Sequence, residues 1–140
     1  MSVSLVDIRS FIAALPDVSV DDSTADLFFF RGDEAKFPFA TIVTHDDPYD
    51  AFSNLSRSGV FRLNFATNSQ TFAKLFPGLQ TKAALAEAKI DYRAHDVLFP
   101  HPVYGGARWV SVINPDSLWN RCEELLTKAH QIRELRPNSW

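Results

Sequence analysis

The residue of this sequence whose type and setting best suit chemistry is His101, in the stretch "FPHPVYGGARW". Pro100 and Pro102 restrict the backbone of the residues before them, so the direction of the imidazole is set by the backbone. A histidine held in this way can act as a general base or orient a ligand, because it titrates near neutral pH. It can equally make a structural hydrogen bond that holds its loop to a sheet. We expect the structural bond first and a ligand contact second.

Arg62 is the second candidate, since it lies in the predicted strand "GVFRLNFAT", whose opposite face is strongly apolar. If Arg62 faces a concavity, its guanidinium can bind a carboxylate or phosphate through two hydrogen bonds. The alternatives are a solvated side chain or a pair with a carboxylate of the protein itself. Tyr104 and Trp109, on either side of the glycine pair that follows His101, are further candidates for lining a ligand site.

His45 lies beside carboxylates in "THDDPYD", a run that resembles ligands for a divalent ion or an acid/base pair. Neighbours on a strand point to opposite faces, however, and Asp-Asp-Pro is above all a turn signal. No spaced ligand set accompanies these residues, and no nucleophile elbow, phosphate loop or dinucleotide fingerprint occurs. We expect no metal and no cofactor, and keep His45 as a candidate ligand-binding residue.

Composition excludes several classes of function. The 140 residues have a formal net charge of −3 and no run of Lys or Arg, so nucleic-acid binding is not expected. A single cysteine, Cys122, forms no internal disulfide, and its place in an apolar helix stripe favours a core role. The N-terminus lacks the unbroken apolar stretch of a signal peptide, and no segment approaches the roughly eighteen apolar residues of a membrane span. We therefore expect a cytoplasmic protein without membrane contact.

The elements that position these residues follow from hydrophobic spacing. Apolar residues three and four apart predict a helix over 4–15, and Pro115 starts a long final helix. Between these helices lie a short strand near 18–22, a hairpin over 26–47 with a Gly32-Asp33 turn, and strands over 59–67 and 108–115. Two short middle helices precede the last strand, one beginning at Asn68 or Ser69 and one over 81–89.

This order predicts an α+β fold, with an antiparallel sheet and the N- and C-terminal helices packed on one face. Residues 1–140 are expected to form one domain, with 135–140 as a frayed tail. The run "LFFF" at 27–30 is apolar on both strand faces, so the second face must also be covered or used. The middle helices could cover it, or it could hold an apolar ligand or a second copy of the chain. The loop over 46–59 is long enough to be either functional or poorly ordered.

Several segments together resemble a family of small bacterial proteins catalogued as a domain of unknown function. The most specific of them are "GVFRLN", "PHPVY" and "WVSVINP", and the match covers most of residues 25–130. The order of elements is also similar to the broader MmcQ/YjbR-like group. That likeness implies a leading helix, a curved antiparallel sheet and a final helix, but no reaction, because a shared fold does not transfer function.

The sequence therefore predicts an uncharacterised cytoplasmic module that binds a small molecule or a protein, with a homodimer as one form of partner. The residues expected to line its site are His101, Tyr104, Arg62, Trp109 and His45. The alternative is a small hydrolase-type enzyme with His101 as general base and Arg62 as anion clamp. An enzyme requires His101 in a cleft with a second polar group nearby, whereas a structural role requires bonds from its ring to the backbone.

Overall fold

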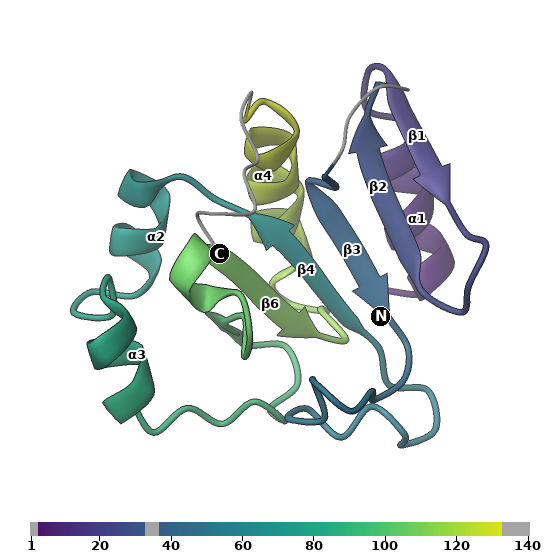
Figure 1. The fold of residues 1–140 in the computed structure, drawn as a ribbon. Helices are drawn as coiled ribbons and strands as arrows, with labels where there is room; N and C mark the ends of the chain where they lie inside the picture. Colours follow the sequence, from purple (N-terminus) through teal and green to yellow (C-terminus); the bar gives the residue numbers. More distant parts are fainter. Residues whose placement is uncertain (1–2, 33–36, 133–140) are drawn as a thin grey trace.

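The computed structural model describes residues 3–32 and 37–132, and in these ranges the strands form one six-stranded antiparallel sheet with the order β1-β2-β3-β4-β6-β5 (Figure 1). The strands are β1 (Val18–Asp21), β2 (Leu27–Arg31), β3 (Ala40–Val43), β4 (Arg62–Ala66), β5 (Leu98–Pro100) and β6 (Trp109–Ile113). The helices are α1 (Leu5–Ala13), α2 (Ser69–Leu75), α3 (Lys82–Glu87) and α4 (Trp119–His130), with a 3-10 turn η1 (Gly105–Ala107). The predicted α+β class is confirmed. The expected frayed tail lies outside the described residues.

Both terminal helices cover the same face of the sheet, as the hydrophobic pattern predicts (Figure 1). Leu63 and Phe65 of β4 point to this face, and Val110 of β6 joins them. They form one buried cluster with Ile8 of α1 and Leu125 of α4. Because side chains alternate along a strand, the residues between these apolar ones must face the other side of the sheet.

The start of α4 differs from the sequence expectation. The helix begins at Trp119 rather than directly after Pro115, because the carboxylate of Asp96 binds the turn that precedes it. Asp96 accepts hydrogen bonds from the backbone N–H groups of Asp116, Ser117 and Leu118, at 2.7–3.1 Å. An acidic side chain far away in the sequence thus fixes the turn that leads into the helix, and no local pattern reveals it.

Strand β5 was not expected, since its residues lie in the rigid "FPHP" stretch that the sequence describes as a loop. Pro100 has no N–H to donate, but β5 is at the edge of the sheet and pairs only with β6. An edge strand tolerates a proline because one of its sides has no strand partner. The strand brings the chain directly to His101.

The second face of the sheet has one continuous row of side chains that runs across five strands. The register aligns, from β2 to β5, Phe28, Thr41, Asn64, Ser111 and Phe99. Residues directly opposite each other in neighbouring strands share a face. The middle of this row is therefore polar and its ends are aromatic.

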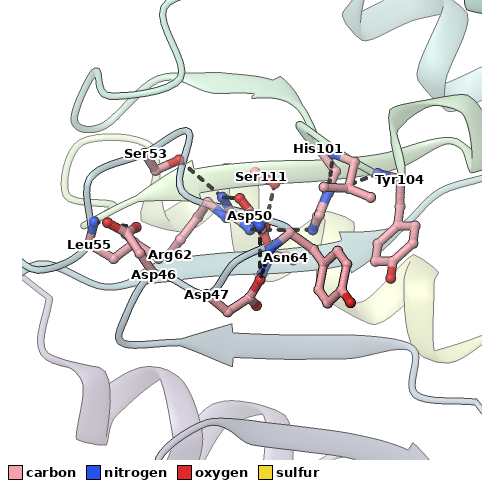
Figure 2. A network of polar contacts seen from close by, with 12 residues as sticks. Asp46, Asp47, Asp50, Ser53, Leu55, Arg62, Asn64, His101, Tyr104 and Ser111 are labelled. Carbon is pink, nitrogen blue, oxygen red and sulfur yellow. Dashed lines mark hydrogen bonds and ion pairs between the residues drawn. The ribbon is translucent and has the colours of Figure 1, made fainter.

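The next row on the same face contains Val43, Arg62 and Ile113. The long loop between β3 and β4 crosses this face near Arg62, and the turn after β5 crosses it near Asn64 (Figure 2). Helices α2 and α3 lie beyond β6, at the opposite side of the sheet from β2 (Figure 1). Phe28 of β2 lines a cavity to which neither helix contributes a residue. The interpretation that the middle helices cover the second aromatic face is wrong, because loops do so instead.

Candidate functional site

Arg62 is buried, with only 1% of its surface exposed, and its charge is matched by Asp50. The carboxylate of Asp50 accepts hydrogen bonds from both terminal nitrogens of the guanidinium, one from Nη1 at 3.1 Å and one from Nη2 (Figure 2). Asp50 lies in the loop between β3 and β4, so this pair ties the loop to the sheet. Of the alternatives considered for the Arg62 side chain, the structure shows the ion pair with a carboxylate of the protein itself.

The other guanidinium hydrogens are nearly all engaged as well. Nε donates to Asn64 Oδ1 at 2.9 Å, and Nη1 donates to Ser53 Oγ at 3.0 Å. A guanidinium has five N–H groups, and these contacts with Asp50, Asn64 and Ser53 occupy four of them. The fifth is the second hydrogen of Nη2, whose neighbour is His101 Nε2 at 3.4 Å.

His101 is fixed by the main chain on the other side of its ring. Its Nδ1 accepts hydrogen bonds from the backbone N–H groups of Val103 at 3.0 Å and Tyr104 at 2.9 Å. An atom that accepts two N–H groups does not carry a proton, so we assign the proton of the neutral ring to Nε2. The expected structural bond from His101 to its own loop is present.

The ring is held in its neutral form. Burial, and secondly the positive charge of Arg62, lower the pKa of His101 well below 6.5. Nε2–H is therefore a donor, and so is the guanidinium nitrogen that faces it. Neither of these two groups can accept a hydrogen bond from the other. In the part of the chain that the structure describes, Nε2 makes no hydrogen bond to an acceptor, and its polar neighbour is Arg62 Nη2.

Asn64 and its neighbours fix the floor of the site. Asn64 Oδ1 accepts from Ser111 Oγ at 2.7 Å as well as from Arg62 (Figure 2). Its Nδ2 donates to Thr41 Oγ1 at 3.0 Å. These bonds determine which end of the amide faces Arg62. The network couples β3, β4 and β6 and holds the guanidinium in one orientation.

A cavity of about 470 Å³ opens beside this network. Its polar wall includes Arg62, His101 and Asn64, together with the carboxylates Asp26, Asp47 and Asp50. Its aromatic wall is formed by Phe28, Phe37, Tyr49, Tyr104 and Trp109. The volume lies within the range of pockets that hold small molecules, and the combination of aromatic walls with a few fixed polar groups is typical of them.

Four of the five residues proposed from the sequence lie together around this cavity: Arg62, His101, Tyr104 and Trp109. The ring of Tyr104 packs beside that of His101, with 4.9 Å between their centres. His45 is not among the lining residues. Its Nδ1 lies 3.3 Å from Asp26 Oδ1, and its side chain is half exposed.

Asp50, Ser53 and Phe28 are among the site residues that sequence reasoning missed. Asp50 and Ser53 come from a loop without periodicity, so nothing local indicated that they meet Arg62. Phe28 had a signal, because the "LFFF" run is apolar on both faces of its strand.

Two other features of the structure are weaker candidates for a functional site. A larger cavity of about 620 Å³ lies beneath the same loop, but Arg57 on its wall already donates to the carbonyl oxygens of Ser53 and Asn54. Cys122 is fully buried, and burial first, then Asp96 and Glu123, raise the pKa of its thiol to about 12. It is a core residue, as expected, rather than a nucleophile.

Residues 3–32 and 37–132 contain neither a metal-binding cluster nor a helix that could span a membrane. Within these ranges no three His, Cys, Asp or Glu side chains come together in a way that could hold a metal ion. None of the helices there has the length and apolar character needed to cross a bilayer.

Comparison with known proteins identifies one family. Neither the curated proteins nor the solved structures contain a significant match to this chain. A family model described as a family of unknown function, DUF6194, matches residues 3–139. The matched range includes the loop that contributes Asp50, the strand that contains Arg62 and the turn that contains His101. The chain therefore belongs to DUF6194, as its resemblance to a domain of unknown function predicts.

Proposed function

We propose that this protein binds a small molecule in the cavity of about 470 Å³, with an acceptor atom of the ligand placed between Arg62 Nη2 and His101 Nε2. The observation that supports this function is that two buried donors 3.4 Å apart, Arg62 Nη2 and His101 Nε2, each have one hydrogen without an acceptor among the described residues, while the other hydrogen of Nη2 is bound to Asp50. A buried donor left unpaired costs about 1–3 kcal/mol, so a ligand oxygen that accepts from both groups would be stabilised.

The enzyme hypothesis requires a different form of His101. A general base accepts a proton through a free lone pair, and in this site that lone pair would have to be on Nε2. The two backbone donors favour the lone pair on Nδ1 instead, where it is already used. Binding through a neutral N–H donor is therefore the function that the geometry supports better.

The state of the ring can be measured directly. We expect ¹⁵N NMR of His101 to give the chemical-shift pattern of a neutral imidazole with its proton on Nε2 at neutral pH. A proton on Nδ1 would contradict the proposal and would restore the general-base hypothesis.

A small molecule is favoured over a protein partner because the donors lie inside a concave site of limited volume. The cytoplasmic location, the bacterial origin and the likeness to the MmcQ/YjbR-like group stay predictions from the sequence, as does the homodimer.

Binding is tested with four single-ring probes of similar size: phenol, benzamide, benzoate and benzylamine. In ¹H–¹⁵N NMR titrations of the full chain, we expect at least one probe to shift the amide signals of cavity residues such as Thr41, Asn64 and Tyr104. Val43, which lines the cavity, provides a blocking variant, Val43→Phe.

The matched control is Val97→Phe, because Val97 is 48% exposed and is not part of the cavity wall. Val43→Phe should abolish the shifts and Val97→Phe should preserve them. The proposed function is rejected if none of the four probes shifts the cavity signals, or if Val43→Phe has no effect on binding.

A further inference from the structure

We infer that the ligand is an uncharged, planar carbonyl compound, such as an aromatic amide or lactam, rather than a carboxylate or a phosphate. This inference rests on the proposed function and adds the chemical class of the ligand. It follows from the charges around the cavity, from the kind of polar atom that can accept hydrogen bonds from both donors, and from the shape of the walls.

The charges argue against an anion. The positive charge of Arg62 is already matched by Asp50, which binds the guanidinium with both carboxylate oxygens. His101 is neutral, because burial and Arg62 hold its pKa well below 6.5. Two further carboxylates, Asp26 and Asp47, line the same cavity. An arriving anion would therefore meet three carboxylates and a single, already paired cation, which repel it more than they attract it.

The donor pair also selects the atom that binds. Nη2 and Nε2 each offer one hydrogen from positions 3.4 Å apart, and a carbonyl oxygen has two lone pairs that can accept both. A carbonyl oxygen brings no hydrogen of its own to this place, whereas an ammonium group would bring only hydrogens toward two donors. A neutral carbonyl is thus complementary in both charge and hydrogen bonding.

The walls favour a flat molecule. Phe28 and Trp109 come from the same face of the sheet, and Tyr104 comes from the turn that holds His101. Aromatic side chains stack on or pack edgewise against planar rings with specific geometry. A ring with a carbonyl substituent can therefore pack against aromatic side chains while its oxygen reaches the donors.

The test compares three of the probes, which differ only in the group on the ring. We expect the full-length protein to bind benzamide at least tenfold more tightly than either benzoate or benzylamine in the NMR titrations. If benzoate or benzylamine binds the cavity as tightly as benzamide or more tightly, this inference is wrong while the proposed function stands. If no probe binds there, the proposed function itself fails.

A variant of Asp50 tests the charge argument independently. Asp50→Asn removes the charge that matches Arg62, so the order of affinity should reverse and benzoate should bind more tightly than benzamide. The matched control is Asp47→Asn, which makes the same change on the cavity wall at a residue with no hydrogen bond to Arg62 among the described contacts. It should keep the preference for benzamide.

An unchanged preference in a folded Asp50→Asn protein would overturn the inference. Thermal unfolding establishes whether that variant is folded. If it is not, the order of the three affinities in the unmodified protein decides the question alone.

Discussion

At the scale of single residues, His101 combines two roles that the sequence presented as alternatives. Its Nδ1 accepts the backbone N–H groups of Val103 and Tyr104, which is a structural bond. The same bonds leave Nε2–H as a donor toward Arg62 and the cavity. The structural contact thus determines the chemistry of the side of the ring that faces Arg62, as is common for oriented histidines.

The low pKa of His101 predicts how stability depends on pH. In the unfolded chain the ring binds a proton near pH 6.5, and in the folded protein only well below that value. Between these two values the unfolded chain holds more protons, so the contribution of His101 is complete above pH 6.5 and is lost as the pH falls. We expect the free energy of unfolding to fall by at most about 1.4 kcal/mol per pH unit through this group.

Urea denaturation between about pH 7.5 and pH 5 measures this effect, with His101→Gln as the comparison, since it removes only this titration. The unmodified protein should lose more stability than the variant over the range. Parallel pH profiles for the two proteins would show that His101 does not contribute.

Arg62 and Asp50 form a buried pair, and removing one member leaves the other charge unmatched. We expect Arg62→Met to lower the free energy of unfolding by about 3–5 kcal/mol. The matched control is Arg9→Met, since Arg9 pairs with Asp22 at the surface, where both side chains are about half exposed. Arg9→Met should lower the free energy of unfolding by less than about 1 kcal/mol.

The double variant Arg62→Met with Asp50→Leu removes both charges and should recover part of the loss. Urea denaturation compares the unmodified protein with Arg62→Met, Arg9→Met and the double variant. If Arg62→Met and Arg9→Met lower the free energy of unfolding by the same amount, the buried pair does not stabilise the fold.

At the scale of elements, sheet register brings the polar site together. Thr41, Asn64 and Ser111 come from three different strands and meet in one cross-strand row. A shift of one residue in any of these pairings would turn that strand's polar side chain into the apolar core on the other face. The burial of Leu63 and Phe65 beneath the terminal helices therefore also fixes the direction of Arg62 and Asn64.

The contact between Asp96 and the start of α4 is the element-scale feature with the clearest stability prediction. Burial raises the pKa of Asp96, but hydrogen bonds from Ser117 and from three backbone N–H groups outweigh that effect and lower it. We expect Asp96→Ala to lower the free energy of unfolding by about 0.5–2 kcal/mol, because it removes the acceptor for the three backbone N–H groups of the turn that leads into α4.

Asp96→Asn should lower the free energy of unfolding less than Asp96→Ala does, for two reasons. The amide oxygen can still accept hydrogen bonds, and Asn tolerates the positive φ of 55° at this position. Chemical denaturation and helical circular dichroism compare the two variants. If the two variants lower the free energy of unfolding equally, hydrogen bonds to residue 96 do not stabilise the start of α4.

At the scale of the whole molecule, the two faces of the sheet contact different kinds of structure. The helical face holds the fully buried core, while the other face holds a buried polar network and an open cavity. Exposed apolar side chains surround this cavity, among them Tyr49 at 87% and Val103 at 42% exposure. If the homodimer predicted from the sequence forms, we expect it to use this rim, because an exposed apolar rim favours a protein contact.

We expect size-exclusion chromatography with light scattering to give about twice the mass of the 15.8 kDa chain at high concentration. Tyr49→Lys should shift the protein toward the monomer, because it places a charge in an apolar contact. Val6→Lys is the control, since Val6 is equally apolar, 67% exposed and lies on α1 at the other face of the sheet. A monomer mass at all concentrations would contradict the homodimer.

The sequence by itself determined the fold class, because the hydrophobic periods of the terminal helices and of "GVFRLNFAT" depend only on local spacing. Proline and glycine marked the ends of several elements for the same local reason. The sequence also singled out His101 and Arg62 as candidate residues through their immediate neighbours.

Only the tertiary structure decided what those two side chains contact. Asp50 lies 12 residues from Arg62 and His101 lies 39 residues from it. Such contacts depend on strand register and on the path of two loops, which have no periodic signal. The proton on His101 Nε2, the match of Arg62 by Asp50 and the cavity beside them all follow from that long-range arrangement, because hydrogen-bond partners and burial set the charge state of a group.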